Sequence, residues 1–128
     1  MAGVSKGAAG EMIAARFLRD KKYSILAANY RCRFGEVDII AADRSYIAFV
    51  EVKTRREDAL FSPREAVTVA KQRRIVQTAA MYLSHFPSSL QPRFDVIEVV
   101  TAAEDPMKVI ELNHIIGAYE TGDLHSSF

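Results

Sequence analysis

Residues 35–55 read GEVDIIAADRSYIAFVEVKTR and contain two apolar runs separated by a short polar break. The runs, 36–42 and 46–53, are rich in β-branched and aromatic residues, and residues 43–45 (Asp-Arg-Ser) lie between them. Two such runs joined by a few polar residues are typical of a β-hairpin. We therefore predict a central hairpin around which the rest of the chain is arranged.

Side chains alternate between the two faces of a strand, so each run divides into two sets. The predicted sets of the first strand are Val37, Ile39 and Ala41 on one face and Glu36, Asp38 and Ile40 on the other. Those of the second strand are Val50 and Val52 on one face and Phe49, Glu51 and Lys53 on the other. A turn centred on residues 44 and 45 would place Asp38 directly opposite Glu51 and Glu36 opposite Lys53, with Cβ atoms roughly 5 Å apart. An odd-length loop would separate them.

Two carboxylates that face each other across a sheet repel and destabilise the pairing. A divalent cation would offset this repulsion, because Mg²⁺ is typically bound by one or two carboxylates together with waters and phosphate oxygens. Lys53 would then lie at the same site as Asp38 and Glu51, where its ammonium could orient a water or meet a phosphate. A different register would place Asp38 opposite Lys53, and these charges would form ordinary cross-strand ion pairs.

The length and the charge distribution indicate one domain with two unlike halves. The 128 residues, 49% of them apolar, are enough for one packed core, so we expect a single domain over 1–128. Residues 1–93 contain sixteen basic and nine acidic residues, a net charge of +7, whereas residues 94–128 contain one and seven, a net charge of −6. This asymmetry favours one face that binds a polyanion. The alternative is a chance segregation of solvated charges.

Cysteine usage and hydropathy bear on the compartment. The chain has one cysteine, Cys32, and so cannot form an internal disulfide, as is typical of a reducing compartment. Its first residues, MAGVSKGAAGE, lack the apolar core of a signal peptide. No segment approaches the ~18 apolar residues of a membrane span. We expect a cytoplasmic protein with no membrane partner.

The remaining elements are predicted from periodicity and capping signals. A first helix should run from Ser5 to about Lys21, and a first strand should follow at 23–30. Residues 62–65 (Ser-Pro-Arg-Glu) form a capping box, and the helix that they open should continue to about His85 with a pause at the β-branched run 67–69. Strands are predicted at 94–100 and 109–112, and residues after about 117 are expected to be flexible. The predicted fold is α/β, a mixed sheet flanked by helices in the order αβββαββ.

Two further sets of charged residues are candidates for a functional role. Glu11 shares a helix face with Ala14, Ala15 and Leu18, which is unexpected for a solvated glutamate. One explanation is a position at the rim of that face, where the carboxylate reaches water or favours the helix N-terminus. Lys71 and Arg74 are one turn apart on the second helix and could grip a phosphate together, or they could form a solvated basic face.

The ordered set of motifs resembles the PD-(D/E)xK nuclease superfamily. Its signature is Gly-Glu-Val-Asp at 35–38 followed by Phe-Val-Glu-Val-Lys-Thr-Arg at 49–55, with Val37 replacing the proline that names the superfamily. The wider pattern is similar to the YraN family of predicted endonucleases, relatives of archaeal Holliday-junction resolvases. It adds Gly10-Glu11, Asn29-Tyr30-Arg31, Lys71-x-x-Arg74 and Arg93-Phe94-Asp95-Val96. The resemblance covers roughly residues 6–100, and the segment after Asn113 matches no motif.

The resemblance implies a restriction-endonuclease-like fold and metal-dependent hydrolysis of DNA phosphodiesters. The catalytic set that it implies is Glu11, Asp38, Glu51 and Lys53, with Glu36 as a weaker candidate. The ligands implied for Mg²⁺ or Mn²⁺ are Asp38, Glu51 and the backbone carbonyl of Val52. The residues expected to contact DNA phosphates are Arg55, Arg56, Lys71 and Arg74.

The resolvase resemblance also implies a homodimer that prefers branched DNA, because two active sites related by a two-fold axis would match a two-fold-symmetric substrate. Two alternatives remain. One is a non-catalytic nucleic-acid-binding protein that keeps the nuclease fold, and the other is an accessory protein that docks on repair or recombination partners through its acidic tail. The set of Asp38, Glu51 and Lys53 favours catalysis, because carboxylates that face a phosphate backbone do not help a protein that only binds it.

Overall fold

The computed structural model describes residues 6–59 and 67–120. Within these residues five strands form one sheet in the order β1-β2-β3-β4-β5, in which β3 and β4 are parallel and the other neighbours antiparallel. The elements are α1 Lys6–Asp20, β1 Ser24–Cys32, β2 Gly35–Ala42, β3 Tyr46–Arg56, α2 Val69–His85, β4 Gln91–Thr101 and β5 Val109–Ile115. The predicted α/β class, the mixed sheet and the order αβββαββ are confirmed.

The helix α2 is part of the crossover that joins the two parallel strands, since parallel neighbours need a long connection. Thr68 caps this helix in an extended conformation, and its side chain accepts a hydrogen bond from the backbone N–H of Lys71. The predicted pause at 67–69 is therefore the start of the helix, and its predicted end at His85 is confirmed. The predicted capping box at 62–65 lies outside the described residues.

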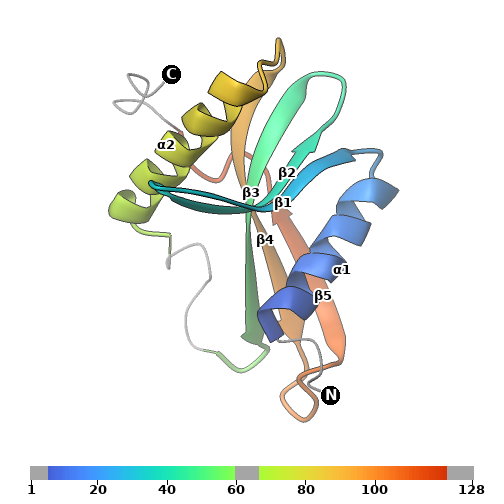
Figure 1. Cartoon of the computed structure of the whole chain (residues 1–128). Helices are drawn as coiled ribbons and strands as arrows, with labels where there is room; N and C mark the ends of the chain where they lie inside the picture. Colours follow the sequence, from blue (N-terminus) through green and yellow to red (C-terminus); the bar gives the residue numbers. More distant parts are fainter. Residues whose placement is uncertain (1–5, 60–66, 121–128) are drawn as a thin grey trace, which may run out of the picture.

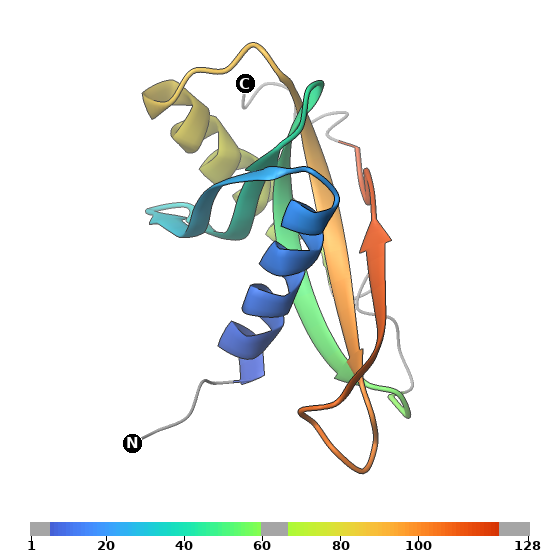
Figure 2. The same cartoon turned by 90° about the vertical axis from the view of Figure 1, so that its right-hand side faces the viewer.

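The two helices cover opposite faces of the sheet, and the strands run between them (Figure 1). Ala14 and Leu18 of α1 pack on the face that carries Ile39 and Val50, as expected from the helical stripe. Figure 2 shows the same arrangement from the side, with β5 at the outer edge of the sheet. No helix in the described ranges is long and apolar enough to cross a membrane.

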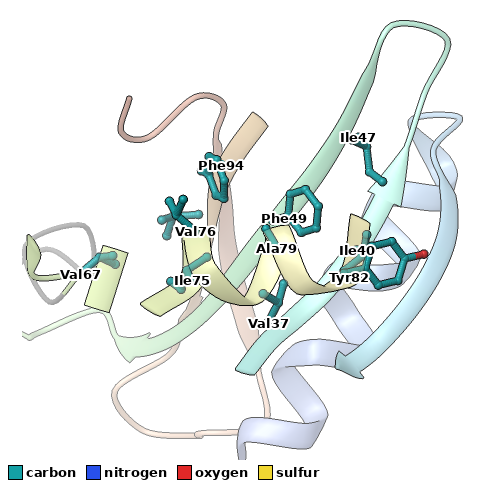
Figure 3. Packing of buried hydrophobic residues seen from close by; sticks show 11 residues of the cluster. Val37, Ile40, Ile47, Phe49, Val67, Ile75, Val76, Ala79, Tyr82 and Phe94 are labelled. Carbon is teal, nitrogen blue, oxygen red and sulfur yellow. The ribbon is translucent and has the colours of Figure 1, made fainter. Parts of the chain in front are cut away.

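The other face is covered by α2, whose apolar side chains point at β2 and β3 (Figure 3). The residues that form this contact are Ile75, Val76, Ala79 and Tyr82 from the helix and Val37, Ile40 and Phe49 from the strands. Burying side chains of this size contributes roughly 1.5–3 kcal/mol each. The same apolar cluster includes Phe94 of β4, so α2 also holds the parallel pair together.

The register of the central hairpin is the predicted one near its turn. Ile39 pairs with Val50 and Ala42 with Ile47, which is the register of an even loop centred on residues 44 and 45. The side chain of Asp43 fixes this turn, because its Oδ1 accepts the backbone N–H of Ser45 at 2.8 Å and that of Tyr46 at 2.7 Å. An Asx turn thus stabilises this hairpin turn, which contains no glycine.

The strands β2 and β3 pair only as far as Ile39 and Val50. Beyond that pair, β2 turns with β1 toward α2, whereas β3 continues beside β4 (Figure 1). The predicted direct pairs Asp38–Glu51 and Glu36–Lys53 are therefore wrong, because the β2–β3 pairs end before these positions. Glu36 pairs instead with Arg31 of β1. We call the place where the two strands separate the fork.

The bend at the fork also corrects one predicted face. Ile39 and Ala41 pack in the cluster under α1, but Val37 packs with Ile40 in the cluster under α2. The alternation is interrupted at Asp38, because the strand leaves the plane of β3 there. The strands are also longer than predicted: β1 continues to Cys32, β3 to Arg56 and β5 to Ile115, and β4 begins at Gln91.

A buried polar network connects β4 with β5 and with the residues after them. Asp95 has no exposed surface and accepts hydrogen bonds from Arg93 at 2.8 and 2.9 Å, from His114 Nε2 at 2.7 Å and from the Gly117 backbone at 3.0 Å. Burial alone would raise the pKa of Asp95, but the bonds from His114 and Arg93 lower it below its ordinary value. After Gly117, the backbone of Ala118 bonds the carbonyl of Phe94, so this segment packs on the core.

Replacing Asp95 should therefore destabilise the fold. We expect Asp95→Asn to lower the free energy of unfolding by about 3 kcal/mol, because it leaves the half-buried Arg93 guanidinium without its buried counter-charge. The folded pKa of Asp95 is lowered, so this contribution is complete above the pKa of the unfolded chain, ~3.9, and is lost as the pH falls through the folded value. Urea denaturation followed by circular dichroism measures both effects. Glu111→Gln, an exposed change on β5, is the control, and equal stabilities of the two variants would contradict the prediction.

Candidate active site

The fork brings Asp38 of β2 to β3 through a side chain instead of the backbone. Asp38 lies next to Ile39, the last β2 residue that pairs with β3. Its Oδ2 accepts a hydrogen bond from the backbone N–H of Val52 at 2.8 Å. The carboxylate thus satisfies a β3 donor at the point where the two strands separate. Glu51, which is 8% exposed, lies beside it on β3, close enough for its charge to act on Asp38.

A cleft of about 490 Å³ opens between β2, β3 and α2. Its walls combine the acidic pair with basic residues of α2 and with the tip of the β1–β2 hairpin. The described residues that line it are Cys32, Arg33, Phe34, Gly35, Glu36, Asp38, Glu51, Lys71, Arg74 and Ile75. The site is therefore a partly open groove with charges of both signs.

Glu11 reaches the same carboxylates from α1. The helix passes so close to β3 at Gly10 that a Cβ atom there would overlap the hydroxyl of Thr54. This close approach places Glu11 within hydrogen-bond reach of Asp38, and the charges of Glu36 and Glu51 also act on it. The half-buried Glu11 thus faces the acidic pair, as the family resemblance implied.

Burial and the charges of neighbouring carboxylates raise the pKa values of Asp38 and Glu11. Burial is the main cause that raises the pKa of Asp38 to about 7, and the charge of Glu51 adds to it, while the N–H of Val52 opposes it. Burial also raises the pKa of Glu11, followed by the charge of Glu36. Such shifts are common where carboxylates are gathered for binding a cation or for catalysis.

Two lysines face these carboxylates. Lys53 Nζ lies 3.0 Å from Oε1 of Glu51, and Lys71 Nζ of α2 lies 2.6 Å from the same oxygen. Burial acts to lower the pKa of Lys53, but its contacts raise the pKa overall, and the carboxylates of Glu51 and Asp38 are the physical reason. Lys53 therefore keeps its positive charge inside the site.

The structure separates the sequence-predicted residues into two groups. One group gathers at the fork and its cleft: Glu11, Asp38, Glu51, Val52, Lys53, Lys71 and Arg74, with Glu36 at the cleft wall beside Arg31. The other group comprises Arg55, which pairs with Glu98 at 2.9 Å, and Arg56, which pairs with Asp58 at 3.0 Å. Neither arginine is among the described residues that line the cleft.

The donor set suits a hard divalent cation that keeps part of its own shell. In residues 6–59 and 67–120, no group of three or more His, Cys, Asp or Glu side chains is placed to hold a metal ion, so these residues form no metal cage of their own. Mg²⁺ does not need such a cage, because one or two carboxylates plus waters and phosphate oxygens suffice. Asp38 and Glu51 provide those carboxylates, and the pKa of Asp38 is raised by burial and by the charge of Glu51, so a positive charge beside Asp38 is favoured.

Sequence reasoning missed the part of the cleft made by the β1–β2 hairpin. Arg33 lies over the Phe34 ring with 4.9 Å between the guanidinium carbon and the ring centroid, and both residues line the cleft. The signal in the sequence was the pair Arg31 and Arg33 directly before the signature, which we did not assign to the site. Tyr119, whose pKa is raised by burial and then by the charge of Glu51, had no signal in the sequence.

Comparisons with known proteins match this sequence to one family. A model of the family described as "Uncharacterised protein family UPF0102" matches residues 10–99, a range that contains every site residue named above except Tyr119. A UPF0102 protein of Symbiobacterium thermophilum is 52% identical over 94 residues, which cover 73% of this chain and 80% of that protein. A relative in Caldanaerobacter subterraneus subsp. tengcongensis is 44% identical over 115 residues, 88% of this chain and 93% of its own. One in Chlorobium phaeobacteroides is 44% identical over 119 residues, 90% of this chain and 94% of its own.

The raised pKa of Asp38 predicts that this residue destabilises the protein at alkaline pH in EDTA. The folded chain binds the Asp38 proton more tightly than the unfolded chain, so stability falls as the pH rises from the unfolded pKa toward about 7. We expect Asp38→Asn to raise the free energy of unfolding by about 2 kcal/mol at about pH 8.5, a value reduced for the partial exposure of the side chain.

Urea denaturation of both proteins at about pH 5 and about pH 8.5 tests this, and the gain should shrink at the lower pH, where wild-type Asp38 is mostly protonated. The exposed change Glu104→Gln serves as the control. A wild-type protein that is the more stable of the two at alkaline pH would show that the ionised Asp38 is favoured by its surroundings.

Proposed function

This chain belongs to the UPF0102 (YraN) family, and we propose that it is a metal-dependent nuclease that hydrolyses DNA phosphodiesters. The observation that carries this proposal is the convergence of Asp38, Glu51 and Lys53 at the fork. Lys53 Nζ lies 3.0 Å from the Glu51 carboxylate, and Asp38 is held beside them by the N–H of Val52. Two carboxylates in a cleft that also carries Arg33, Lys71 and Arg74, with Lys53 beside them, suit a phosphodiester better than a neutral substrate.

In this proposal Asp38 and Glu51 bind Mg²⁺ or Mn²⁺, with the backbone carbonyl of Val52 as a further ligand. When bound, the metal would lower the pKa of a water and neutralise charge that develops on the phosphate. Lys53 orients the attacking water or the scissile phosphate, because the strand fixes its ammonium at the carboxylates. Glu11 hydrogen-bonds within the acidic group and completes it from the α1 side.

The charges of the cleft support a nucleic acid as the partner. Arg33, Lys71 and Arg74 line the same groove as the acidic pair, so a phosphate backbone that enters it meets cations on both walls. Phosphate contacts of this kind position a duplex without reading its sequence. We expect backbone geometry to govern binding.

Branched DNA is the substrate class that we favour within this proposal. One chain provides one fork within its described residues, whereas resolving a branch point with two cuts needs two sites. The sheet edge at β5 exposes Ile110 and Val109 to 45% and 36%, and this edge is where we place the contact of a two-fold dimer. The competing function is a nucleic-acid-binding protein that keeps the site without turnover.

Metal binding and cleavage should depend on the same residues. We expect calorimetry to detect Mn²⁺ binding by the wild type and none by Asp38→Asn or Glu51→Gln. Lys53→Met should still bind Mn²⁺ but lose cleavage of a labelled duplex or four-way junction, because it removes a contact that acts in the transition state.

The surface change Asp58→Asn is the matched control and should leave binding and cleavage unchanged. Mn²⁺ binding that survives in both carboxylate variants would place the metal elsewhere. Metal-dependent DNA binding without any cleavage would favour the non-catalytic alternative.

The salt dependence of DNA binding should identify the residues that touch phosphate. We expect Arg74→Ala to flatten the logarithmic dependence of affinity on salt by about one unit, because each neutralised phosphate contributes roughly that much. Arg56→Ala is the control, since Arg56 pairs with Asp58 away from the described cleft lining and should leave the slope unchanged. Fluorescence anisotropy of a short duplex over a range of salt concentrations measures both slopes, and an unchanged slope in Arg74→Ala would exclude the cleft as the path of the backbone.

A further inference from the structure

Two lysines converge on one oxygen of Glu51, and they are held there differently. Lys53 is two residues away on the same face of β3, so the strand keeps its ammonium beside the carboxylate. Lys71 instead reaches Glu51 from the first turn of α2 and makes the shorter contact, 2.6 Å against 3.0 Å. The side chain of Lys71 is 31% exposed, so it can move into the cleft without breaking the core.

The position of Lys71 in its helix makes the contact with Glu51 important. Residues 69–72, the first turn of α2, contain no acidic residue, and the partial positive charge of a helix N-terminus disfavours a lysine there. The cap at Thr68 fixes the backbone of Lys71 through its N–H. An anion at the end of the side chain therefore stabilises Lys71, and Glu51 is that anion.

A phosphate in the cleft would offer Lys71 a second anion. Lys71 and Arg74 both line the groove and lie one turn apart on the same helix. Glu51, in turn, is one of the two carboxylates proposed to bind the metal. The Lys71–Glu51 pair thus joins a residue that suits the substrate with a residue that suits the metal.

From this geometry we infer that Lys71 is an exchangeable counter-ion, which competes with the divalent cation for Glu51 and, once displaced, binds a substrate phosphate beside Arg74. This inference rests on the proposed function, because both ligands belong to the nuclease reaction. The metal binds Glu51 and so frees Lys71 for the phosphate, and the phosphate binds Lys71 and so frees Glu51 for the metal. Metal and DNA should therefore strengthen each other's binding, by the same factor in both directions.

Calorimetry of Mn²⁺ binding without DNA tests the competition. We expect Lys71→Met to bind Mn²⁺ about fivefold more tightly than the wild type, the factor that corresponds to removing a partly exposed ion pair. Lys71→Gln, which keeps a polar group near Glu51 without the charge, should show the same direction. Arg74→Met is the matched control: it removes one positive charge from the same cleft and helix, but the described ion pairs of Glu51 are to Lys53 and Lys71, so the Mn²⁺ affinity of this variant should stay within about twofold of the wild type.

The coupling between metal and DNA is tested by fluorescence anisotropy of a short duplex with and without Ca²⁺, which the same carboxylate oxygens can coordinate. Ca²⁺ should strengthen duplex binding by the wild type more than by Lys71→Met. The inference would be overturned if both Lys71 variants bound Mn²⁺ no more tightly than the wild type while Asp38→Asn still abolished binding. That result would leave the nuclease proposal standing. Absence of Mn²⁺ binding in the wild type and in both variants would overturn the two together. Thermal midpoints confirm that each variant is folded.

Discussion

The hydrogen bond from the Val52 N–H to the Asp38 carboxylate is the interaction on which the site depends. It lies where β2 leaves β3, and it lets a side chain replace the backbone partner at that point. A continuous ladder would have brought the two acidic residues together on a flat sheet and left no groove. Because the strands separate, the carboxylates border a cleft that α1 and α2 approach from opposite faces.

The arrangement concentrates like charges, and the rest of the fold offsets the repulsion. Gly10 allows α1 to approach β3 closely enough for Glu11 to join the acidic pair. Lys53 and Lys71 supply positive charge at Glu51, one from the strand and one from the crossover helix. The buried network around Asp95 differs in kind, because its carboxylate is fully bonded by Arg93 and His114, and the pKa of Asp95 is lowered.

Much of the central hairpin could be predicted from the sequence, because strand alternation and turn length are local properties of the chain. Alternation and turn length placed Asp38 and Glu51 on one face, and the observed pairs from Ile39 to Ala42 follow the predicted register. The point where pairing stops was not predictable, since it depends on how β1 and α2 draw β2 away from β3. The partner of Arg55 is Glu98, forty-three positions away, and no spacing rule connects them. The candidate charged residues near the signature could therefore be named from the sequence. Which of them line the cleft and which form ion pairs outside it could be decided only from the tertiary structure.

The parallel pairing of β3 with β4 also determines when the cleft can exist during synthesis. Tyr46 pairs with Gln91, so β3 gains this neighbour only after the whole crossover, including α2, has been made. Contacts between such distant segments form slowly, because a long loop must close before they contribute. A nascent chain that ends before α2 contains the acidic residues of the signature but lacks Lys71, Arg74 and the strand that holds β3 in place. The complete cleft can therefore form only when the last third of the chain has been synthesised. A product that is truncated before β4 lacks the strand that holds β3 in place.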